Sequence, residues 1–309
     1  MQPNSGSDMS GRFGGEHQWI IVTGAKGFLG RATLATLQAK GLPCRGVERS
    51  RTDTALDDIL SSMPLADRRR AALIHLAGLA DAQIAQREPV MAVREIVGLV
   101  DRTAQACVRW ELAKFVLVSS AVVYGCQESQ PVSEEALLNP RGIYAGAKAT
   151  AEMAARNCIA GHQVALEIVR PGNVIGPGMK PGTIIRDILG QLRKGEGEQV
   201  VLRSLRTRRD YIHVLDVARA LIEIARLPSV PGETRIFNVG TGIGTSAQEL
   251  SQWLAEAMGK ANMQPAESGP SDVRAFDLVL NSRALTEATG WQPRVPLQTA
   301  LREMVHDAA

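Results

Sequence analysis

A tyrosine and a lysine spaced for one helix face are the side chains best suited to proton transfer. Tyr144 and Lys148 lie four residues apart in the segment Tyr-Ala-Gly-Ala-Lys, and side chains at this spacing share one face of a helix. A neighbouring ammonium group favours the phenolate, so we expect Lys148 to lower the pKa of Tyr144 from its usual value of about 10. The pair would then act as a general acid or base near neutral pH.

A serine lies upstream, where an apolar run ends. Residues 114–119 (KFVLVS) predict a buried strand, and Ser120 follows it directly. Open α/β sheets bind their ligands outside the carboxyl ends of the strands. We therefore expect the Ser120 hydroxyl to hydrogen-bond the reacting oxygen of a substrate. The Tyr-x-x-x-Lys spacing is common by itself, and its meaning depends on the elements that position it.

A glycine-rich segment near the start of the globular region predicts a dinucleotide site. Residues 23–30 (TGAKGFLG) follow the apolar run 19–23 and precede a helical pattern over 28–40. Glycines at this spacing allow a tight turn and a close approach of backbone to a pyrophosphate, which the helix N-terminus attracts. Gly24 and Gly27 are therefore predicted cofactor contacts, and the competing reading is a glycine-rich turn without a ligand.

The end of the second predicted strand should select between NAD and NADP. Glu48 and Arg49 follow the strand 44–48. A carboxylate there binds the adenosine ribose of NAD, whereas an arginine pairs with the 2′-phosphate of NADP. Both residue types are present, and we favour NAD through Glu48.

Strands and helices alternate over the first half of the chain. Further apolar runs at residues 72–76 and 164–170 predict strands, and residues 90–107 and 144–160 predict helices. This alternation predicts a doubly wound parallel sheet of the Rossmann type, covered on both faces. We divide the chain into a tail at 1–17, a nucleotide-binding domain at 18–170 and a substrate-binding lobe at 171–309. The apolar run 234–239 is expected to return to the sheet.

The bulk composition excludes several classes of protein. The formal net charge of +3 over 309 residues is too small to argue for nucleic acid or a membrane surface, and no apolar run reaches the length of a membrane helix. The four cysteines form no close pair, and no His or Cys has metal-ligand spacing. We expect reduced thiols, a cytoplasmic location and no metal site.

The sequence resembles the extended short-chain dehydrogenase/reductase family, which includes NAD-dependent sugar epimerases and dehydratases. The resemblance runs from about residue 19 to the C-terminus and rests on ordered segments. These segments are 23–30 (TGAKGFLG), 75–78 (HLAG), 119–125 (SSAVVYG), 144–148 (YAGAK), 170–178 (RPGNVIGPG), 209–214 (RDYIHV) and 237–240 (FNVG).

The resemblance implies roles for individual residues. It makes Ser120, Tyr144 and Lys148 catalytic, with Tyr144 and Lys148 also contacting the cofactor. The further cofactor contacts that it implies are Phe28, Leu29, Leu76, Ala77, Gly78 and Pro171. The substrate contacts that it implies, besides Ser120, are Val122, Asn173, Arg209 and Arg274. Guanidinium groups suit diphosphate oxygens.

The sequence also departs from the family's pattern. Dehydratases of the family place an Asp-Glu pair directly after the catalytic Ser or Thr, where this chain has Ala121 and Val122. Residues 95–99 (EIVGL) lack the family's asparagine, and Asn281 replaces a common aspartate. Dehydration is therefore not expected, and the substrate periphery differs from that of an ordinary UDP-glucose 4-epimerase.

Three functions remain open. The first is a homodimeric nucleotide-sugar epimerase that passes through a keto-sugar by transient hydride transfer. The second is an NADPH-dependent reductase of a 4-keto nucleotide-sugar or a related ketone. The third is a non-catalytic dinucleotide-binding sensor, which would have no need of Ser120, Tyr144 and Lys148 together.

Overall fold

The computed structural model describes residues 18–48, 52–195, 199–228, 230–268 and 275–307. Two predicted site residues, Arg49 and Arg274, lie outside these ranges, as does the predicted tail at 1–17.

A parallel sheet in the order β2-β1-β3-β4-β5-β9 forms the centre of the larger part of the molecule. Its strands are β1 (Ile20–Thr23), β2 (Cys44–Val47), β3 (Ala72–His75), β4 (Lys114–Val118), β5 (Ala165–Pro171) and β9 (Thr234–Val239). Every residue of β1, β3, β4 and β5 is buried, as expected of strands covered on both faces. The predicted doubly wound α/β fold is confirmed.

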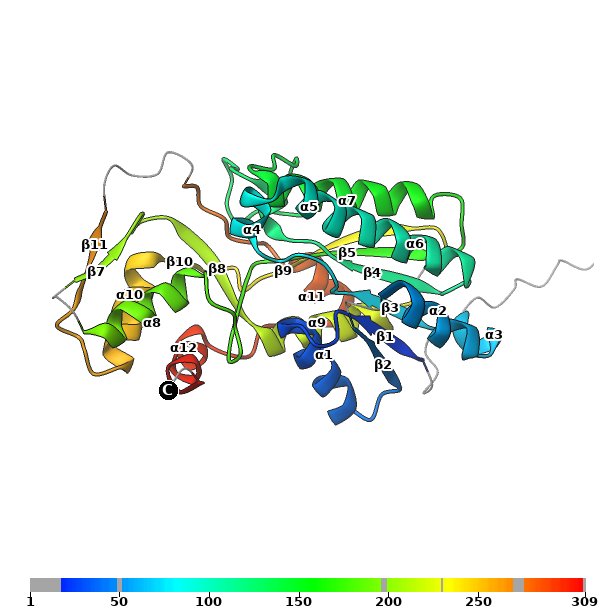
Figure 1. Cartoon of the computed structure of the whole chain (residues 1–309), viewed down its shortest axis with the longest axis horizontal. Helices are drawn as coiled ribbons and strands as arrows, with labels where there is room; N and C mark the ends of the chain where they lie inside the picture. Colours follow the sequence, from blue (N-terminus) through cyan, green and yellow to red (C-terminus); the bar gives the residue numbers. More distant parts are fainter. Residues whose placement is uncertain (1–17, 49–51, 196–198, 229, 269–274, 308–309) are drawn as a thin grey trace, which may run out of the picture.

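Helices cover both faces of this sheet (Figure 1). Those above it in Figure 1 are α4 (Ala82–Arg87), α5 (Pro89–Val93), α6 (Leu99–Arg109) and α7 (Ile143–Ile159). Those below it are α1 (Phe28–Ala39), α9 (Val214–Arg226) and α11 (Arg283–Thr289). The short helices α2 (Thr52–Ser62) and α3 (Leu65–Arg68) follow β2.

Alternate residues of each strand face opposite cores. Leu73, Phe115 and Leu117 pack in one hydrophobic cluster with the α7 residues Ala147 and Ala151. Their neighbours Ile74, Val116 and Val118 pack in a second cluster with residues of α9. This period of two decides which side chains at the ends of the strands come to lie under α7.

A smaller lobe lies at the other end of the molecule (Figure 1). Its strands are β6 (Asn173–Ile175), β7 (Gln199–Leu202), β8 (Arg208–His213), β10 (Gly244–Ser246) and β11 (Gln264–Glu267). They form a three-stranded sheet in the order β10-β8-β6 and a two-stranded sheet of β11 and β7. The lobe's helices are α8 (Ile184–Lys194), α10 (Ala247–Ala257) and α12 (Leu297–Asp307), and apolar residues of all three share one core.

The chain crosses between the two parts more than once. Strand β5 continues through Pro171, and β6 begins the lobe at Asn173. Strand β9 then pairs in parallel with β5, from Leu166 opposite Thr234 to Pro171 opposite Val239. The nucleotide-binding part therefore includes a strand from beyond residue 170. Among the described residues, no helix is both long and apolar enough to span a bilayer.

Candidate active site

The loop between β1 and α1 has no room for side chains at two of its glycines. Gly24 has φ +69°, and a Cβ there would lie 2.7 Å from the carbonyl of Leu76. A Cβ on Gly30 would lie 2.2 Å from the Gly24 carbonyl oxygen. Both positions therefore require glycine. Gly27 precedes α1 as its N-cap, and no side chain of the described residues caps the helix there. The exposed first N–H groups fit the pyrophosphate of a dinucleotide.

The other predicted cofactor residues surround this loop. Phe28 and Leu29 begin α1 and are half-buried. Leu76 follows β3, and its N–H donates to the Thr23 carbonyl at 3.2 Å. Ala77 is 8% exposed, and Gly78 has φ +118°. These residues lie at the carboxyl ends of β1 and β3, where the strand order reverses and open α/β sheets bind ligands.

The predicted ribose selector, Glu48, is exposed at the end of β2. Its carboxylate lies 2.6 Å from the ammonium group of Lys26 in the glycine-rich loop. A basic and an acidic side chain therefore meet where the adenosine ribose is expected. The sequence had left Lys26 unassigned, although its place between two loop glycines was a signal for such a contact.

The three predicted catalytic side chains come together at the carboxyl end of β4. Ser120 caps the short helix η3 (Ala121–Tyr124), and its Oγ accepts from the Val122 N–H at 3.4 Å. Tyr144 lies in the first turn of α7, and its hydroxyl hydrogen-bonds Ser120. The Lys148 ammonium lies 6.0 Å from the centre of the Tyr144 ring. A substrate oxygen beside Ser120 and Tyr144 would thus meet two hydroxyl groups.

The expected pKa of Tyr144 is wrong in direction. Burial of the phenol raises its pKa to about 12, and the hydrogen bond with Ser120 offsets only part of this rise. Lys148 does not reverse the shift, because its ammonium lies 6.0 Å from the ring centre and the desolvation of the phenol dominates. In this geometry Tyr144 is a neutral proton donor.

The pKa of Lys148 is also shifted. Burial lowers it to about 8, against the opposing effect of Glu152 one turn further along α7. The ammonium form is therefore lost as the pH rises through about 8. A charged lysine at neutral pH suits a site that holds hydroxyl oxygens.

A buried polar network that the sequence analysis missed lies behind this site. Arg170 donates through Nε and Nη2 to the two oxygens of Glu152 at 3.0 and 2.6 Å, and through Nη1 to the Tyr124 hydroxyl at 2.9 Å. Tyr124 donates to Asn238 at 2.8 Å. The network joins α7, β5, η3 and β9. The alternation of β5 was the available signal, because it places Arg170 on the same face as Leu166 and Ile168, under α7.

Of the predicted substrate residues, Asn173 and Arg209 lie in neighbouring strands of the lobe, whereas Val122, like the predicted cofactor residue Pro171, belongs to the larger part of the molecule. Asn173 in β6 is paired in register with Tyr211 in β8, and its side chain hydrogen-bonds the Tyr211 hydroxyl. The Arg209 guanidinium lies 4.4 Å from the Phe276 ring centre and donates to the Phe276 carbonyl. Val122 is half-buried in η3, and Pro171 is buried at the end of β5.

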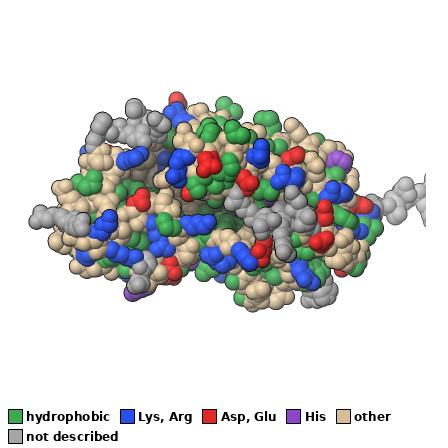
Figure 2. Space-filling view, viewed as in Figure 1, with side chains coloured by type: hydrophobic (Ala, Val, Ile, Leu, Met, Phe, Trp, Pro, Cys, Tyr) green, Lys and Arg blue, Asp and Glu red, His purple; other side chains and the backbone are tan. Residues whose placement is uncertain are grey.

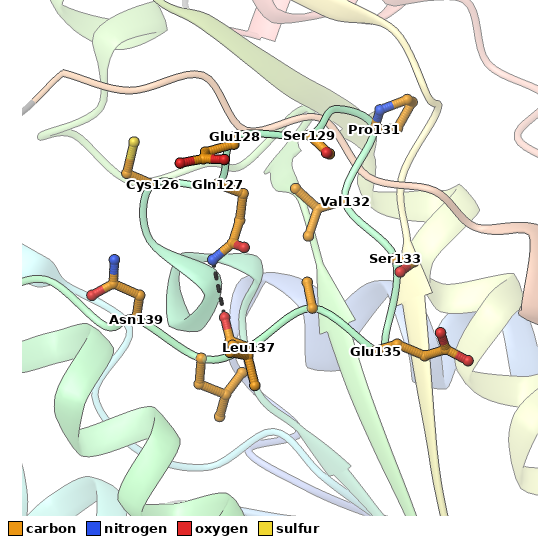
Figure 3. Close-up of a pocket in the computed structure, with 12 residues that line it drawn as sticks. Cys126, Gln127, Glu128, Ser129, Pro131, Val132, Ser133, Glu135, Leu137 and Asn139 are labelled. Atoms are coloured by element: carbon orange, nitrogen blue, oxygen red, sulfur yellow. Dashed lines mark hydrogen bonds between the residues drawn. The ribbon is translucent and has the colours of Figure 1, made fainter.

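One cavity lies in the loop between η3 and α7, outside the predicted catalytic residues. A cavity of about 670 Å³ is bounded by the loop between η3 and α7, including Cys126, Glu128 and Glu135 (Figure 3). Gln127 braces this loop by donating to the carbonyls of Tyr124 at 2.5 Å and Leu137 at 3.0 Å. None of the predicted catalytic residues lines the cavity. Among the described residues, no group of three or more His, Cys, Asp or Glu is placed to hold a metal ion.

The sequence is similar to a known family and to known enzymes over most of its length. The model of the NAD dependent epimerase/dehydratase family matches residues 20–240. The GDP-6-deoxy-D-mannose reductase of Pseudomonas aeruginosa is 27% identical over 94% of this chain and 97% of its own length. The UDP-glucose 4-epimerase of Mycolicibacterium smegmatis is 29% identical over 92% of this chain and 96% of its own length.

Solved structures are similar over nearly the whole chain. The UDP-glucose 4-epimerase of Thermotoga maritima has a TM-score of 0.82 at 23% identity, covering 94% of this chain and 98% of its own, which shows the shared fold. The enzyme RMD of Pseudomonas aeruginosa, solved with NADPH, has a TM-score of 0.80 at 25% identity with the same coverage. The UDP-glucose 4-epimerase of Thermus thermophilus, solved with NAD, has a TM-score of 0.79 at 25% identity, covering 94% of this chain and 98% of its own.

Proposed function

The chain belongs to the NAD dependent epimerase/dehydratase family, and from this premise we propose that it is a nucleotide-sugar epimerase working through a keto-sugar intermediate. The observation that carries the proposal is the meeting of Ser120, Tyr144 and Lys148 at the carboxyl edge of the sheet, beside the glycine-rich loop.

The cofactor is held by the chain's own backbone and a few side chains. The N–H groups at the start of α1 hold the pyrophosphate, and Gly24 and Gly27 leave room for it. The lysine–glutamate pair of Lys26 and Glu48 faces the adenosine ribose. When bound, the nicotinamide supplies the capacity to accept a hydride from a sugar carbon and to return it.

The side chains at the strand end handle the proton. Ser120 holds the sugar oxygen, and Tyr144 exchanges a proton with it. Lys148, with its ammonium fixed to the Val118 carbonyl, positions a ribose hydroxyl and places positive charge near the phenol. Ala121 and Val122 stand where dehydratases have an Asp-Glu pair, and neither can act as an acid or a base. The proposed reaction therefore consists of oxidation and reduction of the sugar without dehydration.

The smaller lobe provides the residues that bind the substrate. Asn173 and Arg209 on β6 and β8, together with Arg274, hold the nucleotide diphosphate. Figure 2 shows a hollow near the middle of one face with Lys and Arg side chains around it, which suits an anionic ligand.

A second candidate is an NADPH-dependent reductase of a 4-keto nucleotide-sugar. Two observations favour it. Burial keeps Tyr144 protonated, with its pKa raised to about 12, as a proton donor to a carbonyl requires. The similarity to a GDP-6-deoxy-D-mannose reductase extends over 94% of the chain. In that case Lys26 and Arg49 would face the 2′-phosphate of NADP.

The proposal includes a homodimer in a reducing, cytoplasmic compartment. Val90 and Val93 on α5 and Met153 on α7 are 75%, 45% and 63% exposed, and the two helices are in contact. Apolar side chains gathered on adjacent helices are typical of a subunit interface. All the cysteines of the described residues are free thiols, which suits the proposed compartment.

Incubation with a panel of UDP-, GDP- and dTDP-sugars and their 4-keto forms tests the function. Reduced nicotinamide is followed by absorbance and products by chromatography, with the Tyr144→Phe variant as control. Interconversion of epimers without net change in nicotinamide supports the epimerase. NADPH loss matched by a reduced sugar identifies the reductase, and an equally active Tyr144→Phe variant would overturn both.

A further inference from the structure

A buried histidine beneath the candidate site has a ring nitrogen that the mechanism above does not use. His75 ends β3 and is 1% exposed. Its Nδ1 lies 2.9 Å from the Thr23 hydroxyl. Its Nε2 has no hydrogen-bond partner among the described residues. An unpaired buried polar atom is destabilising, so such an atom in a folded protein needs an explanation.

The hydrogen bonds of Thr23 favour one tautomer of this ring. Ala77 donates its N–H to the Thr23 hydroxyl oxygen at 3.4 Å, and within the described residues His75 Nδ1 is the acceptor within reach of the hydroxyl proton. The ring proton then resides on Nε2, which makes this atom a donor. The ring stays neutral because burial, and next the charge of Lys148, lower the pKa of His75 to about 3.

Ser119 presents a second unpaired group on the same side of the sheet. Its backbone N–H continues the ladder to Val169 at 2.8 Å, but its buried Oγ has no partner among the described residues. His75 packs edge-on against Phe115, with ring centres 6.0 Å apart, so it lies on the α7 face. Ser119 lies on that face as well, because it is two residues beyond Leu117, which is paired with His75.

The Lys148 ammonium lies above this face with donors to spare. It carries three N–H groups, of which one donates to the Val118 carbonyl at 3.1 Å. Val118 immediately precedes Ser119 in the chain.

We propose that His75 Nε2 and Ser119 Oγ hold an ordered water that accepts a hydrogen bond from Lys148, which makes His75 a positioning residue for this lysine. The water accepts from the His75 Nε2–H and from a Lys148 N–H, and it donates to Ser119 Oγ. Buried waters typically make about three hydrogen bonds of this kind. Held by the water and by Val118, the ammonium keeps its remaining N–H for a ligand.

The inference rests on the proposed function only for the importance of Lys148, and its test does not require the sugar. A crystal structure of the full chain, at a resolution that orders waters, is expected to show one water within hydrogen-bond distance of both His75 Nε2 and Ser119 Oγ. A dry site, or a direct hydrogen bond between the two side chains, would overturn the proposal.

Binding of NADH and NADPH, followed by fluorescence, tests the positioning. His75→Leu removes the donor and is expected to weaken binding about tenfold, the effect of one hydrogen bond to a charged group. His75→Gln offers an amide donor of similar reach and is expected to recover most of the affinity. Ser119→Ala should resemble His75→Leu.

Ser251→Ala is the matched control, because Ser251 in α10 is also buried with an unpaired Oγ but lies in the lobe core. It is expected to leave cofactor affinity unchanged. Equal affinity in wild type and His75→Leu, or equal loss in His75→Leu and His75→Gln, contradicts the positioning role. If no sugar in the panel reacts while these binding differences hold, the water site stands and only the proposed function fails.

Discussion

Two desolvated lysines lie near opposite ends of the central strands, the buried Lys114 in β4 and the half-buried Lys148 in α7, and the two are bonded very differently. At the amino ends of the strands, Lys114 begins β4 and is 0% exposed. It donates to the carbonyls of Ile224 at 2.8 Å and Leu227 at 2.6 Å at the end of α9. Its ammonium also lies 3.8 Å from Glu167, which in turn pairs with Arg235 at 2.5 Å. The Lys114 ammonium therefore has two carbonyl acceptors and a nearby carboxylate.

Lys148 lies at the carboxyl ends of the strands, and its pKa is lowered to the same value, but it has fewer hydrogen-bond partners. Burial lowers the pKa of both lysines to about 8. Lys148 makes one hydrogen bond within the described part of the chain, to the Val118 carbonyl. The pKa alone therefore does not distinguish a structural lysine from one that acts on a ligand. The unused donors beside Ser120 and Tyr144 make that distinction.

The largest effect is expected at the tyrosine. Tyr144→Phe removes the hydroxyl that exchanges the proton, and turnover should fall about 10²–10⁴-fold, the usual contribution of a positioned acid–base group. Cofactor affinity and the free energy of unfolding should stay near those of wild type, because the ring still packs against the core between α7 and the sheet. Steady-state rates, fluorescence titration and chemical denaturation measure the three quantities. Loss of cofactor binding in step with turnover would place the role of Tyr144 in folding instead.

The buried Arg170–Glu152 pair behind the candidate active site should contribute more to the free energy of unfolding than an exposed ion pair does. Glu152→Gln leaves Arg170 buried without its carboxylate partner, and breaking such a pair costs about 3–5 kcal/mol. The matched control is Glu287→Gln, whose partner Arg283 lies 2.6 Å away while both side chains are more than half exposed. Exposed pairs of this kind contribute far less to stability, because water and salt screen them. Equal losses in the free energy of unfolding for the two variants would contradict the account of the network.

Lys114, at the amino ends of the central strands, should contribute to the free energy of unfolding but not to the rate of the reaction. Lys114→Met leaves the carbonyls of Ile224 and Leu227 without their donor, at a cost of about 1–3 kcal/mol for unsatisfied groups. Its rate constants should match those of wild type at a temperature where both are folded. A turnover defect in Lys114→Met larger than its loss of folded protein would show that the two ends of the central strands are coupled.

The sequence predicted the central sheet well because its strands are physically simple. Residues 72–76 and 114–119 are mostly apolar, and a strand buried on both faces needs little more. The strands of the lobe were missed for the opposite reason. Strand β8 contains Arg208, Arg209 and Asp210, and the Asp210 carboxylate is buried by bonds to the backbone of Thr241 and Gly242. No local pattern encodes a partner that lies about thirty residues away.

The candidate site was predictable in its residues but not in its energetics. Motif spacing located Ser120, Tyr144 and Lys148, yet it gave the wrong direction for the pKa of Tyr144. Spacing reports that an ammonium is near a phenol. It does not report that the ammonium is already bonded to Val118, or that burial outweighs the remaining charge effect. The contact of Asn173 with Tyr211 likewise depends on strand register in the lobe.

The pH dependence of turnover tests most directly that Lys148, and not Lys114, governs the chemistry. The folded-state pKa of each lysine is lowered to about 8 from 10.5, so each loses its charge as the pH rises through about 8. Wild type and Lys114→Met should both lose kcat/KM on the basic side with a midpoint near pH 8. Lys148→Met should be nearly inactive at all pH values, with an undiminished free energy of unfolding, because it removes a buried charge. A basic limb that disappears in Lys114→Met, or an active Lys148→Met variant, would contradict the account.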